Sequence, residues 1–381
     1  MLRQEHKTGS RICSCRECAM HLLNGYCMDR IWRSCEQALN CMLREEQGYR
    51  MNIAQIAEMA GVSKAAVSRY FNDGYISEEK REAVRRVVEE TGYRPSLQAQ
   101  MLRTKKTKMI GVIVPKIASS SIGRVVEGIL NVLNENGYKA LLAVTQNDPK
   151  KELEYLAAFN EKQVDGVIFS ATVFSAEHKK LLQHLSVPVV IVGQHLSGYC
   201  CVFHDDYHAT YDLTRLLLEK GRKHVGYIGA MQQDKAVGAE RLRGFQEAVH
   251  DLGYGHLAQN CVTATFTSSS GYDKMGELLE KCADIDAVVC ATDTMASGAI
   301  QYLAERNIRV PEQILVAGQG DSDVSRVTAP PLITIHYSYE KSGELAVQML
   351  MQTLERKDVA YKEVKLGYHI VEPTAYKMMY G

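Results

Sequence analysis

Seven short runs of apolar, mostly β-branched residues recur between residues 109 and 381. Each run is apolar at nearly every position, which indicates strands that are buried on both faces of a sheet. The stretches between most of them carry apolar residues at helical spacing, as Val125, Ile129, Val132 and Leu133 do. The predicted strands are MIGVIVP, YKALLAV, VDGVIFS, VPVVIVG, KHVGYIG, IDAVVCA and QILVAG.

This alternation of strand and helix predicts parallel sheets joined by right-handed crossovers. So many strands within residues 109–381 favour two stacked α/β subdomains over one large sheet. We then expect a ligand at the carboxyl ends of the strands, in a cleft between the subdomains.

Residues 51–95 carry a different pattern, that of three short helices. Asn52 and Gln55, three positions apart, predict a capping box at the start of the first helix. Gly61 interrupts the helical pattern, and Ser63 is suited to begin the second helix. With the third helix that follows, this arrangement is typical of a helix-turn-helix unit.

The second predicted helix has two faces. Val67 and Phe71 lie four positions apart and are expected to face the core together with Val62. Lys and Arg among small residues fit the major groove of DNA, where Arg pairs with guanine and an Ala methyl contacts thymine. Every three-helix bundle exposes charges, so the spacing alone also allows a purely structural role. The predicted outward-facing residues are Lys64, Ala65, Ser68 and Arg69.

A basic stretch follows the three helices. Arg103, Lys105, Lys106 and Lys108 have no acidic residue between them, which fits contact with DNA phosphates or, alternatively, a solvated linker. The whole chain is balanced, with 45 Lys and Arg and 45 Asp and Glu among 381 residues. Affinity for DNA must therefore come from local charge, and residues 51–108 carry 11 Lys and Arg against 7 Asp and Glu.

Composition disfavours several classes of protein. The 11 cysteines are an odd number in a long chain, which argues against a secreted disulfide framework and for a reducing cytosol. No apolar run reaches the length of a membrane span, and no signal peptide is evident. We expect a cytoplasmic, nucleoid-associated protein without a membrane partner.

The strings AGVSKAAVSRYFN, ISEEKREAVRRVVEETGYRP and AQMLRTKKTKMIGVIVP resemble the lactose-repressor (LacI/GalR-type) family of bacterial transcription factors. VDGVIF, HDDYHATYDLTRLLLEKGRKHVGYIG and ATDTMASGAIQYL are most similar to repressors of sucrose and trehalose operons. The resemblance implies an all-α helix-turn-helix headpiece and an α/β sensor of two Rossmann-like subdomains, like a type I periplasmic binding protein. It also implies a homodimeric repressor, without cofactor or metal, that leaves pseudo-palindromic double-stranded operator DNA when a sugar or sugar phosphate binds. A non-sugar or co-repressing effector is the alternative.

The family pattern implies roles for individual residues of the headpiece. It places a hinge helix within residues 96–108, from which Leu102 wedges into the minor groove. Lys64, Ala65 and Arg69 match base-contacting positions. The predicted phosphate-contacting residues are Ser63, Ser68, Asn72, Lys105 and Lys106.

In the sensor, Asp293 matches the aspartate that binds effector hydroxyls, and Arg241 matches the arginine that reaches into the cleft. A carboxylate and a guanidinium suit a polyol, since each can form paired hydrogen bonds with adjacent hydroxyls. Two alternatives remain open. Asp293 can be merely the N-cap of the helix TMASGAIQYL, and Arg241 can be a surface charge on a helix.

Two segments of the sensor depart from the family pattern. KIASSSIG stands where many relatives carry NPFF, and GQGDSD, with Gln319, stands in place of GFDD. Both changes make the expected cleft less apolar and are compatible with a phosphorylated sugar. We predict polar effector contacts from Lys116 and Gln194. Tyr339 either closes the cleft or belongs to the core.

Two other functional classes are disfavoured. An enzyme is suggested only by the Gly-x-Gly of VAGQGDSD, where Asp323 replaces the third glycine or alanine of a dinucleotide-binding loop. The chain has no Walker A, HExxH or nucleophile-elbow sequence. A sugar-binding transport protein of this fold would carry a signal peptide and no headpiece, and the sequence indicates the opposite.

Residues 1–50 are rich in cysteine, with CSCREC near His21, but the CxCxxC spacing matches no strong zinc pattern. They could be a regulatory arm. Our preferred hypothesis is that Met51 is the true start, since REEQGYR can be encoded by purine-rich codons that resemble a ribosome-binding site. A native N-terminal peptide containing Cys13 or Trp32 would refute it. The predicted domains are 1–50 (leader), 51–95 (DNA binding), 96–108 (hinge and linker) and 109–381 (effector binding and dimerisation).

Overall fold

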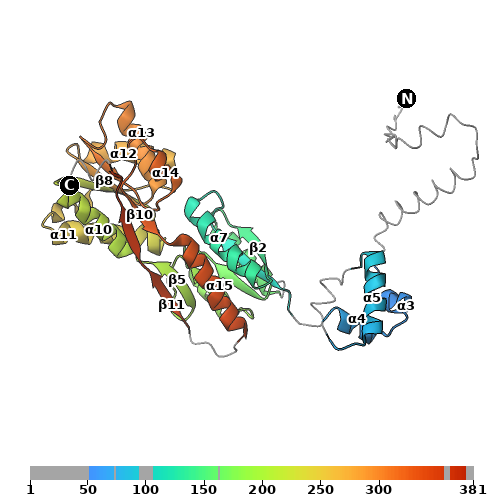
Figure 1. Ribbon diagram of the computed structural model, residues 1–381. Helices are drawn as coiled ribbons and strands as arrows, with labels where there is room; N and C mark the ends of the chain where they lie inside the picture. The colour runs from blue at the N-terminus through green and yellow to red at the C-terminus, as the bar shows by residue number, and fades with distance from the viewer. Residues whose placement is uncertain (1–50, 73, 94–105, 162–163, 356–360, 375–381) are drawn as a thin grey trace, which may run out of the picture. The chain divides into compact units, whose positions relative to one another are not determined.

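The computed structural model describes residues 51–72, 74–93, 106–161, 164–355 and 361–374. The chain divides into two compact units, the first ending at Gln100 and the second beginning at Met101. Each unit is described by itself (Figure 1). The leader 1–50 and most of the predicted hinge, with Leu102 and Lys105, lie outside the described residues.

Three helices form the small unit. The Asn52 side chain accepts hydrogen bonds from the N–H groups of Ala54 and Gln55, and the Gln55 side chain accepts one from Asn52, which confirms the predicted capping box. Gly61 has φ +63° in the turn, and Ser63 caps the second helix as predicted. The helices are α3 (Ile53–Met59), α4 (Lys64–Tyr70) and α5 (Glu78–Thr91). Their core is Ile56, Ala57, Val67, Val84 and Val87.

The first subdomain of the large unit is built on a parallel sheet of six strands, in the order β11-β5-β4-β3-β1-β2. Neighbouring residues of one strand face different cores: Val112 packs with α7 and α15, and Ile113 packs with α8 and α9. This explains why its central strands read as continuous apolar runs. The strands are β1 (Met109–Val114), β2 (Lys139–Val144), β3 (Gly166–Phe169), β4 (Val189–Val192), β5 (Cys200–His204) and β11 (Glu363–Leu366). The helices are α7 (Ser120–Glu135), α8 (Pro149–Asn160), α9 (Ala176–Gln183) and α15 (Tyr339–Glu355).

The second subdomain has a parallel sheet in the order β7-β6-β8-β9 and an antiparallel pair, β10 and β12. Helices α10 and α11 pack together, as do α12 and α13. The strands are β6 (Val225–Gly229), β7 (Cys261–Thr263), β8 (Ala287–Cys290), β9 (Leu315–Ala317), β10 (Thr334–Tyr337) and β12 (Tyr368–Val371). The helical segments are α10 (Asp206–Glu219), the π-helix η1 (Lys235–Glu240), α11 (Arg241–Asp251), the 3₁₀ helix η2 (Gly255–Gln259), α12 (Ser268–Lys281), α13 (Asp293–Glu305) and α14 (Asp323–Val327).

The chain passes between the subdomains three times: between β5 and α10, between β10 and α15, and between β11 and β12. Three short connections of this kind suit a hinge between two rigid lobes. The prediction of two Rossmann-like subdomains is therefore confirmed. All seven predicted strands form, whereas β5, β7, β10, β11 and β12 were missed.

Glycines bring two helices of the first subdomain into close contact. A Cβ atom on Gly128 of α7 would lie 2.0 Å from the carbonyl oxygen of Glu340 in α15. A Cβ on Gly343 of α15 would lie 2.1 Å from the carbonyl oxygen of Val125. Figure 1 shows α7 and α15 side by side. Only glycine allows the two backbones to approach so closely.

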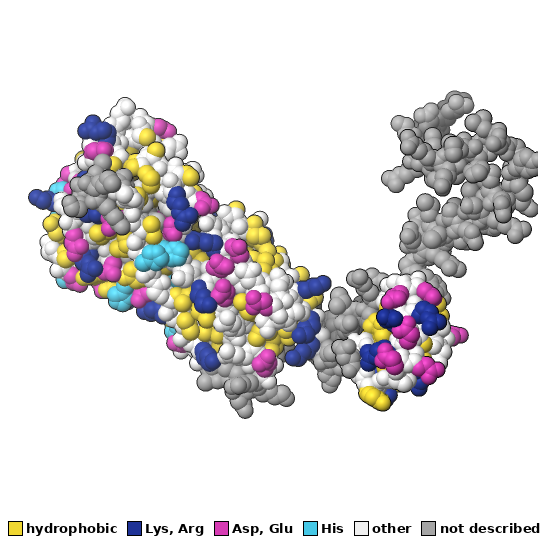
Figure 2. Space-filling view, in the orientation of Figure 1, with side chains coloured by type: hydrophobic (Ala, Val, Ile, Leu, Met, Phe, Trp, Pro, Cys, Tyr) yellow, Lys and Arg dark blue, Asp and Glu magenta, His cyan; other side chains and the backbone are white. Residues whose placement is uncertain are grey.

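The surface of the large unit is electrostatically mixed. Acidic and basic side chains are interspersed on its visible face (Figure 2). Within the described residues, no helix has the length and apolar character to cross a membrane.

Candidate functional sites

The outer face of α4 carries the residues predicted to contact DNA bases. Lys64, Ala65 and Arg69 are exposed, whereas Val67 on the opposite face is fully buried. Among the described residues, neither Lys64 nor Arg69 makes an ion pair, so both charges face solvent. The end of α4 is anchored by Phe71, whose ring makes an edge contact with Tyr93 at 5.6 Å. The helix is thus held by its core face and presents a basic outer face.

The predicted phosphate-contacting residues flank this face. The Ser63 hydroxyl is used as the cap of α4, where it accepts from the Ala66 N–H at 3.2 Å. Asn72 lies just beyond the helix and donates to the backbone oxygen of Ser68. Lys106 is exposed.

A cavity of about 430 Å³ lies between the two subdomains of the large unit. It is bounded by residues that follow the carboxyl ends of strands in both sheets, which is where the strand pattern places a ligand. All five predicted effector residues line it: Lys116, Gln194, Arg241, Asp293 and Tyr339.

Arg241 is 3 % exposed, so the interpretation as a surface charge is wrong. Its Nε donates to Asp206 Oδ1 at 2.7 Å, and Nη2 lies 2.6 Å from the same oxygen. Nη1 donates to the carbonyl oxygen of Ala291, and the guanidinium carbon lies 4.8 Å from the centre of the Tyr337 ring. The arginine enters the cleft with its orientation already determined by protein contacts.

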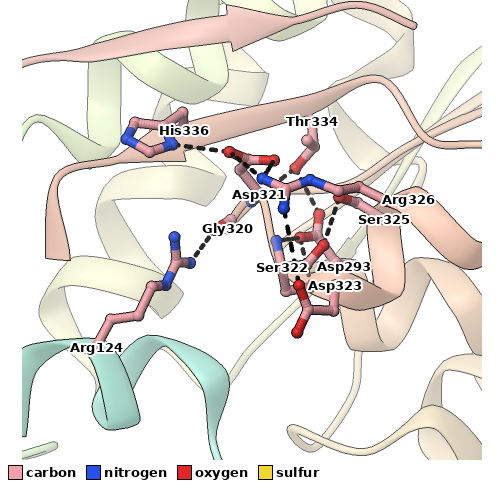
Figure 3. Close-up of polar contacts among 10 residues, drawn as sticks. All are labelled: Arg124, Asp293, Gly320, Asp321, Ser322, Asp323, Ser325, Arg326, Thr334 and His336. Atoms are coloured by element: carbon pink, nitrogen blue, oxygen red, sulfur yellow. Dashed lines mark hydrogen bonds and ion pairs between the residues drawn. The ribbon is translucent and has the colours of Figure 1, made fainter. Parts of the chain in front are cut away.

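Asp293 is the first residue of α13, and the N-cap is Thr292, so the N-cap interpretation of Asp293 is wrong. Its carboxylate accepts from both the N–H and the hydroxyl of Ser322, each at 2.8 Å, and from the Thr334 hydroxyl at 2.5 Å (Figure 3). A Cβ on Gly318 would lie 2.5 Å from Oδ1, so glycine is required beside it. Burial raises the pKa of Asp293.

A second carboxylate, Asp234, lies in the same cavity and was missed by the sequence analysis. It caps η1, accepting from the Val237 N–H at 3.0 Å, and the Gln194 amide nitrogen lies 3.4 Å from its Oδ1. Burial raises the pKa of Asp234 to about 6. The Gln194 amide also donates to the carbonyl oxygen of Ala171 at 3.1 Å, so the predicted polar contact has a fixed geometry.

Gln319, the second departure from the family pattern, makes its hydrogen bonds inside the protein. It is 2 % exposed, and its oxygen accepts from the Thr210 hydroxyl at 3.2 Å and the Tyr337 hydroxyl at 2.8 Å. Tyr339 lines the cavity and also packs against the core, and its role in closing the cleft stays a prediction. Gln319 therefore offers the cleft little unused polarity.

Arg124 of α7, also missed, spans the cleft. Its Nη2 donates to the carbonyl oxygen of Gly320 in the other subdomain (Figure 3). Its guanidinium carbon lies 4.9 Å from the centre of the Tyr339 ring. The contact with Gly320 could not be found from the sequence, since 196 positions separate it from Arg124.

Comparison with known proteins assigns both units. The profile of bacterial regulatory proteins of the lacI family matches residues 52–96, and that of a periplasmic binding protein-like domain matches residues 214–372. The sucrose operon repressor of Staphylococcus xylosus is 31 % identical over 306 residues, which cover 80 % of this chain and 94 % of that protein. The chain belongs to the LacI family.

Other LacI-family proteins match along a similar length. The transcriptional regulator RegA of Clostridium saccharobutylicum is 31 % identical over 324 residues, covering 84 % of this chain and 98 % of RegA. The structure of the regulator CelR in complex with cellobiose has a TM-score of 0.66 and 27 % identity, and the match covers 85 % of this chain and 99 % of CelR. The structure of the lac repressor dimer bound to operator supports the same fold, with a TM-score of 0.77 and 21 % identity. That match covers 84 % of this chain and 98 % of the lac repressor chain.

Family membership decides between the functional classes. A LacI-family chain with a helix-turn-helix headpiece is a DNA-binding transcriptional regulator, not an enzyme or a transport receptor.

Proposed function

We propose that this regulator represses a sugar-utilisation operon and leaves its operator when a sugar or sugar phosphate occupies the 430 Å³ cavity. The observation that carries the proposal is a buried guanidinium and two buried carboxylates, those of Arg241, Asp234 and Asp293, lining one cavity between two hinged lobes. A relative that represses a sucrose operon and a structural neighbour bound to cellobiose support a sugar as the effector.

The DNA contact is proposed for the exposed face of α4. Arg69 and Lys64 would enter the major groove with Ala65 between them, and Ser63, Ser68 and Asn72 would contact phosphates. A homodimer would place two such helices on a pseudo-palindrome, as the operator-bound lac repressor dimer suggests. Residues 96–108 would then link headpiece to sensor, with Leu102 in the minor groove. Such a regulator works in the cytoplasm, at the nucleoid.

Effector binding would act through the three connections between the lobes. Hydroxyls of the sugar would bridge Asp293 and Arg241, which belong to one lobe, to Gln194 and Lys116, which belong to the other. A ligand shifts such an equilibrium only by its difference in affinity for the two states, typically ~1–3 kcal/mol. Closing the cleft on a sugar would therefore change the separation of the two headpieces in the dimer.

Operator binding tests the proposal. Arg69→Ala should weaken binding to the operator by roughly 1–3 kcal/mol and relax base preference at one position of each half-site. Arg86→Ala, an exposed arginine on α5, is the matched control and should leave base preference unchanged. Fluorescence anisotropy on operator and base-substituted duplexes measures both. If Arg69→Ala keeps the wild-type base preference, α4 is not the recognition helix.

The linker and the effector need separate measurements. Lys105→Ala or Lys106→Ala should weaken binding to all duplexes about equally and lower the dependence of affinity on salt. Sucrose, trehalose, fructose and their phosphates are then added to the operator complex. Release by one of them supports the proposal, and retention of the operator with all of them would contradict a sugar inducer.

A further inference from the structure

One wall of the effector cavity is positively charged. Lys116 follows β1 and Arg124 lies on α7, so both belong to the first subdomain, and both line the cavity. Among the described residues, neither side chain makes an ion pair. On the opposite wall, by contrast, Arg241 is neutralised by Asp206. The first wall therefore carries two cations without an ion-pair partner among the described residues, whereas the carboxylates of Asp234 and Asp293 lie on the opposite wall.

Arg124 has hydrogen-bonding capacity that is not used. Nη2 donates to the carbonyl oxygen of Gly320, and the guanidinium stacks on the ring of Tyr339. Its Nε is buried and has no hydrogen-bond partner within the part of the chain that the structure describes. A buried donor without a partner is unfavourable, so such an atom in a cavity wall indicates that something else completes its bonding.

His204 provides a second, independent indication. It is 7 % exposed and lines the same cavity, and its ring centre lies 5.0 Å from that of Tyr339, the ring that Arg124 also contacts. Burial lowers the pKa of His204, although the charge of Asp206 and a hydrogen bond with the backbone of Ser338 oppose this. Its Nε2 is buried and finds no hydrogen-bond partner in the described ranges of the chain. Two unsatisfied nitrogens thus lie against Tyr339.

The start of α7 adds to this charge. Ser119 is the N-cap but its side chain makes no capping bond, so the first-turn N–H groups of this 16-residue helix are left to other partners. Ser119, Ser120 and Ser121 all line the cavity, between Lys116 and Arg124 in the chain. The N-terminus of a long helix favours an anion, and the two cations on the same wall strengthen that preference.

We infer that the effector is a phosphorylated sugar whose phosphate binds to Arg124, Lys116 and the first turn of α7. The sugar hydroxyls then reach His204 and the carboxylates of the opposite wall. This inference rests on the proposed function and specifies its ligand. A sugar acid would offer the same anionic chemistry through a carboxylate, and the experiment distinguishes the two.

The first experiment needs no knowledge of the sugar. Inorganic phosphate is titrated against the full chain at constant ionic strength, with chloride as the comparison, and thermal unfolding of the sensor is recorded. Phosphate should stabilise the wild type more than chloride does. Arg124→Gln should abolish the difference, Arg124→Lys should retain part of it, and Lys179→Gln, an exposed site on α9, should behave as wild type. An equal response of the wild type and Arg124→Gln would overturn the inference.

The second experiment compares matched ligands by calorimetry: glucose, glucose 6-phosphate and gluconate, then fructose, sucrose and trehalose with their 6-phosphates. The phosphorylated member of one pair should bind about ten- to a hundredfold tighter than its neutral partner, as expected of charge-assisted hydrogen bonds. Arg124→Gln should remove that preference while circular dichroism remains unchanged. Tighter binding of a neutral sugar or of gluconate would contradict the proposed phosphate subsite.

Failure of the inference and failure of the proposed function are separable. If a neutral sugar binds best and releases the operator, the anion subsite is wrong and the repressor mechanism stands. If phosphate binds through Arg124 but no sugar phosphate releases the operator, the subsite stands and the induction mechanism is wrong.

Discussion

The buried ion pair between Arg241 and Asp206 makes a sharp prediction about stability. Their side chains are 4 % and 5 % exposed, and two guanidinium nitrogens lie within 2.7 Å of one carboxylate oxygen. Arg241→Met fills similar space but leaves the Asp206 carboxylate in the protein interior without its partner. Removing one member of a buried pair costs about 3–5 kcal/mol, because an uncompensated charge remains in a poorly polarisable environment. The free energy of unfolding of the sensor should fall by that amount.

Urea denaturation followed by circular dichroism measures the change, and a lowered melting temperature, by about 2–4 °C per kcal/mol, provides a second measurement. Arg243→Met is the matched control, two residues further along α11. Its side chain is 53 % exposed and pairs with Glu240 on the surface, so it should cost less than about 1 kcal/mol. The double variant Arg241→Met with Asp206→Asn should lose less than the sum of the single changes. Equal, small losses for Arg241→Met and Arg243→Met would refute the reasoning.

Three further predictions concern pH, packing and capping. Burial raises the pKa of Asp234 from 3.8 to about 6, so its contribution to stability is present below about pH 4 and is lost as the pH rises through 6. In urea denaturation across this range, the free energy of unfolding should decline less for Asp234→Asn than for the wild type. Gly128→Ala should lower sensor stability by about 1–3 kcal/mol in thermal melts, because its Cβ would collide with Glu340, whereas Gly123→Ala on the same helix meets no atom within 4 Å and should not destabilise. Asn52→Ala removes a cap worth about 1 kcal/mol and should speed hydrogen exchange of the α3 amides in the full chain; unchanged exchange would contradict that role.

Local sequence patterns predicted much of the architecture. The strands buried on both faces, such as β1 and β3, were recognisable because such a position excludes polar residues along the whole run. Three of the missed strands lack this signal for a physical reason. Strand β7 has three residues, and β11 and β12 are only partly buried, so their sequences carry polar residues that a helix or loop would also accept.

The headpiece was predictable to the level of single side chains. Its caps and its turn depend on residues at most a few positions apart, as between Asn52 and Gln55. The outer face of α4 follows from helical spacing once Val67 is placed in the core. Its assignment to DNA came from resemblance, since exposed charges alone do not identify a partner.

The sequence by itself determined which segments become strands and helices and which face of each is apolar, because these properties arise from neighbours along the chain. Only the tertiary structure decided that Arg241 pairs with Asp206, that Asp293 is held by Thr334, and that Arg124 and His204 meet at one tyrosine. These partners lie tens to hundreds of positions apart. They come together because two sheets, folded across three connections, bring the ends of their strands to a common cleft, and no local periodicity encodes that meeting.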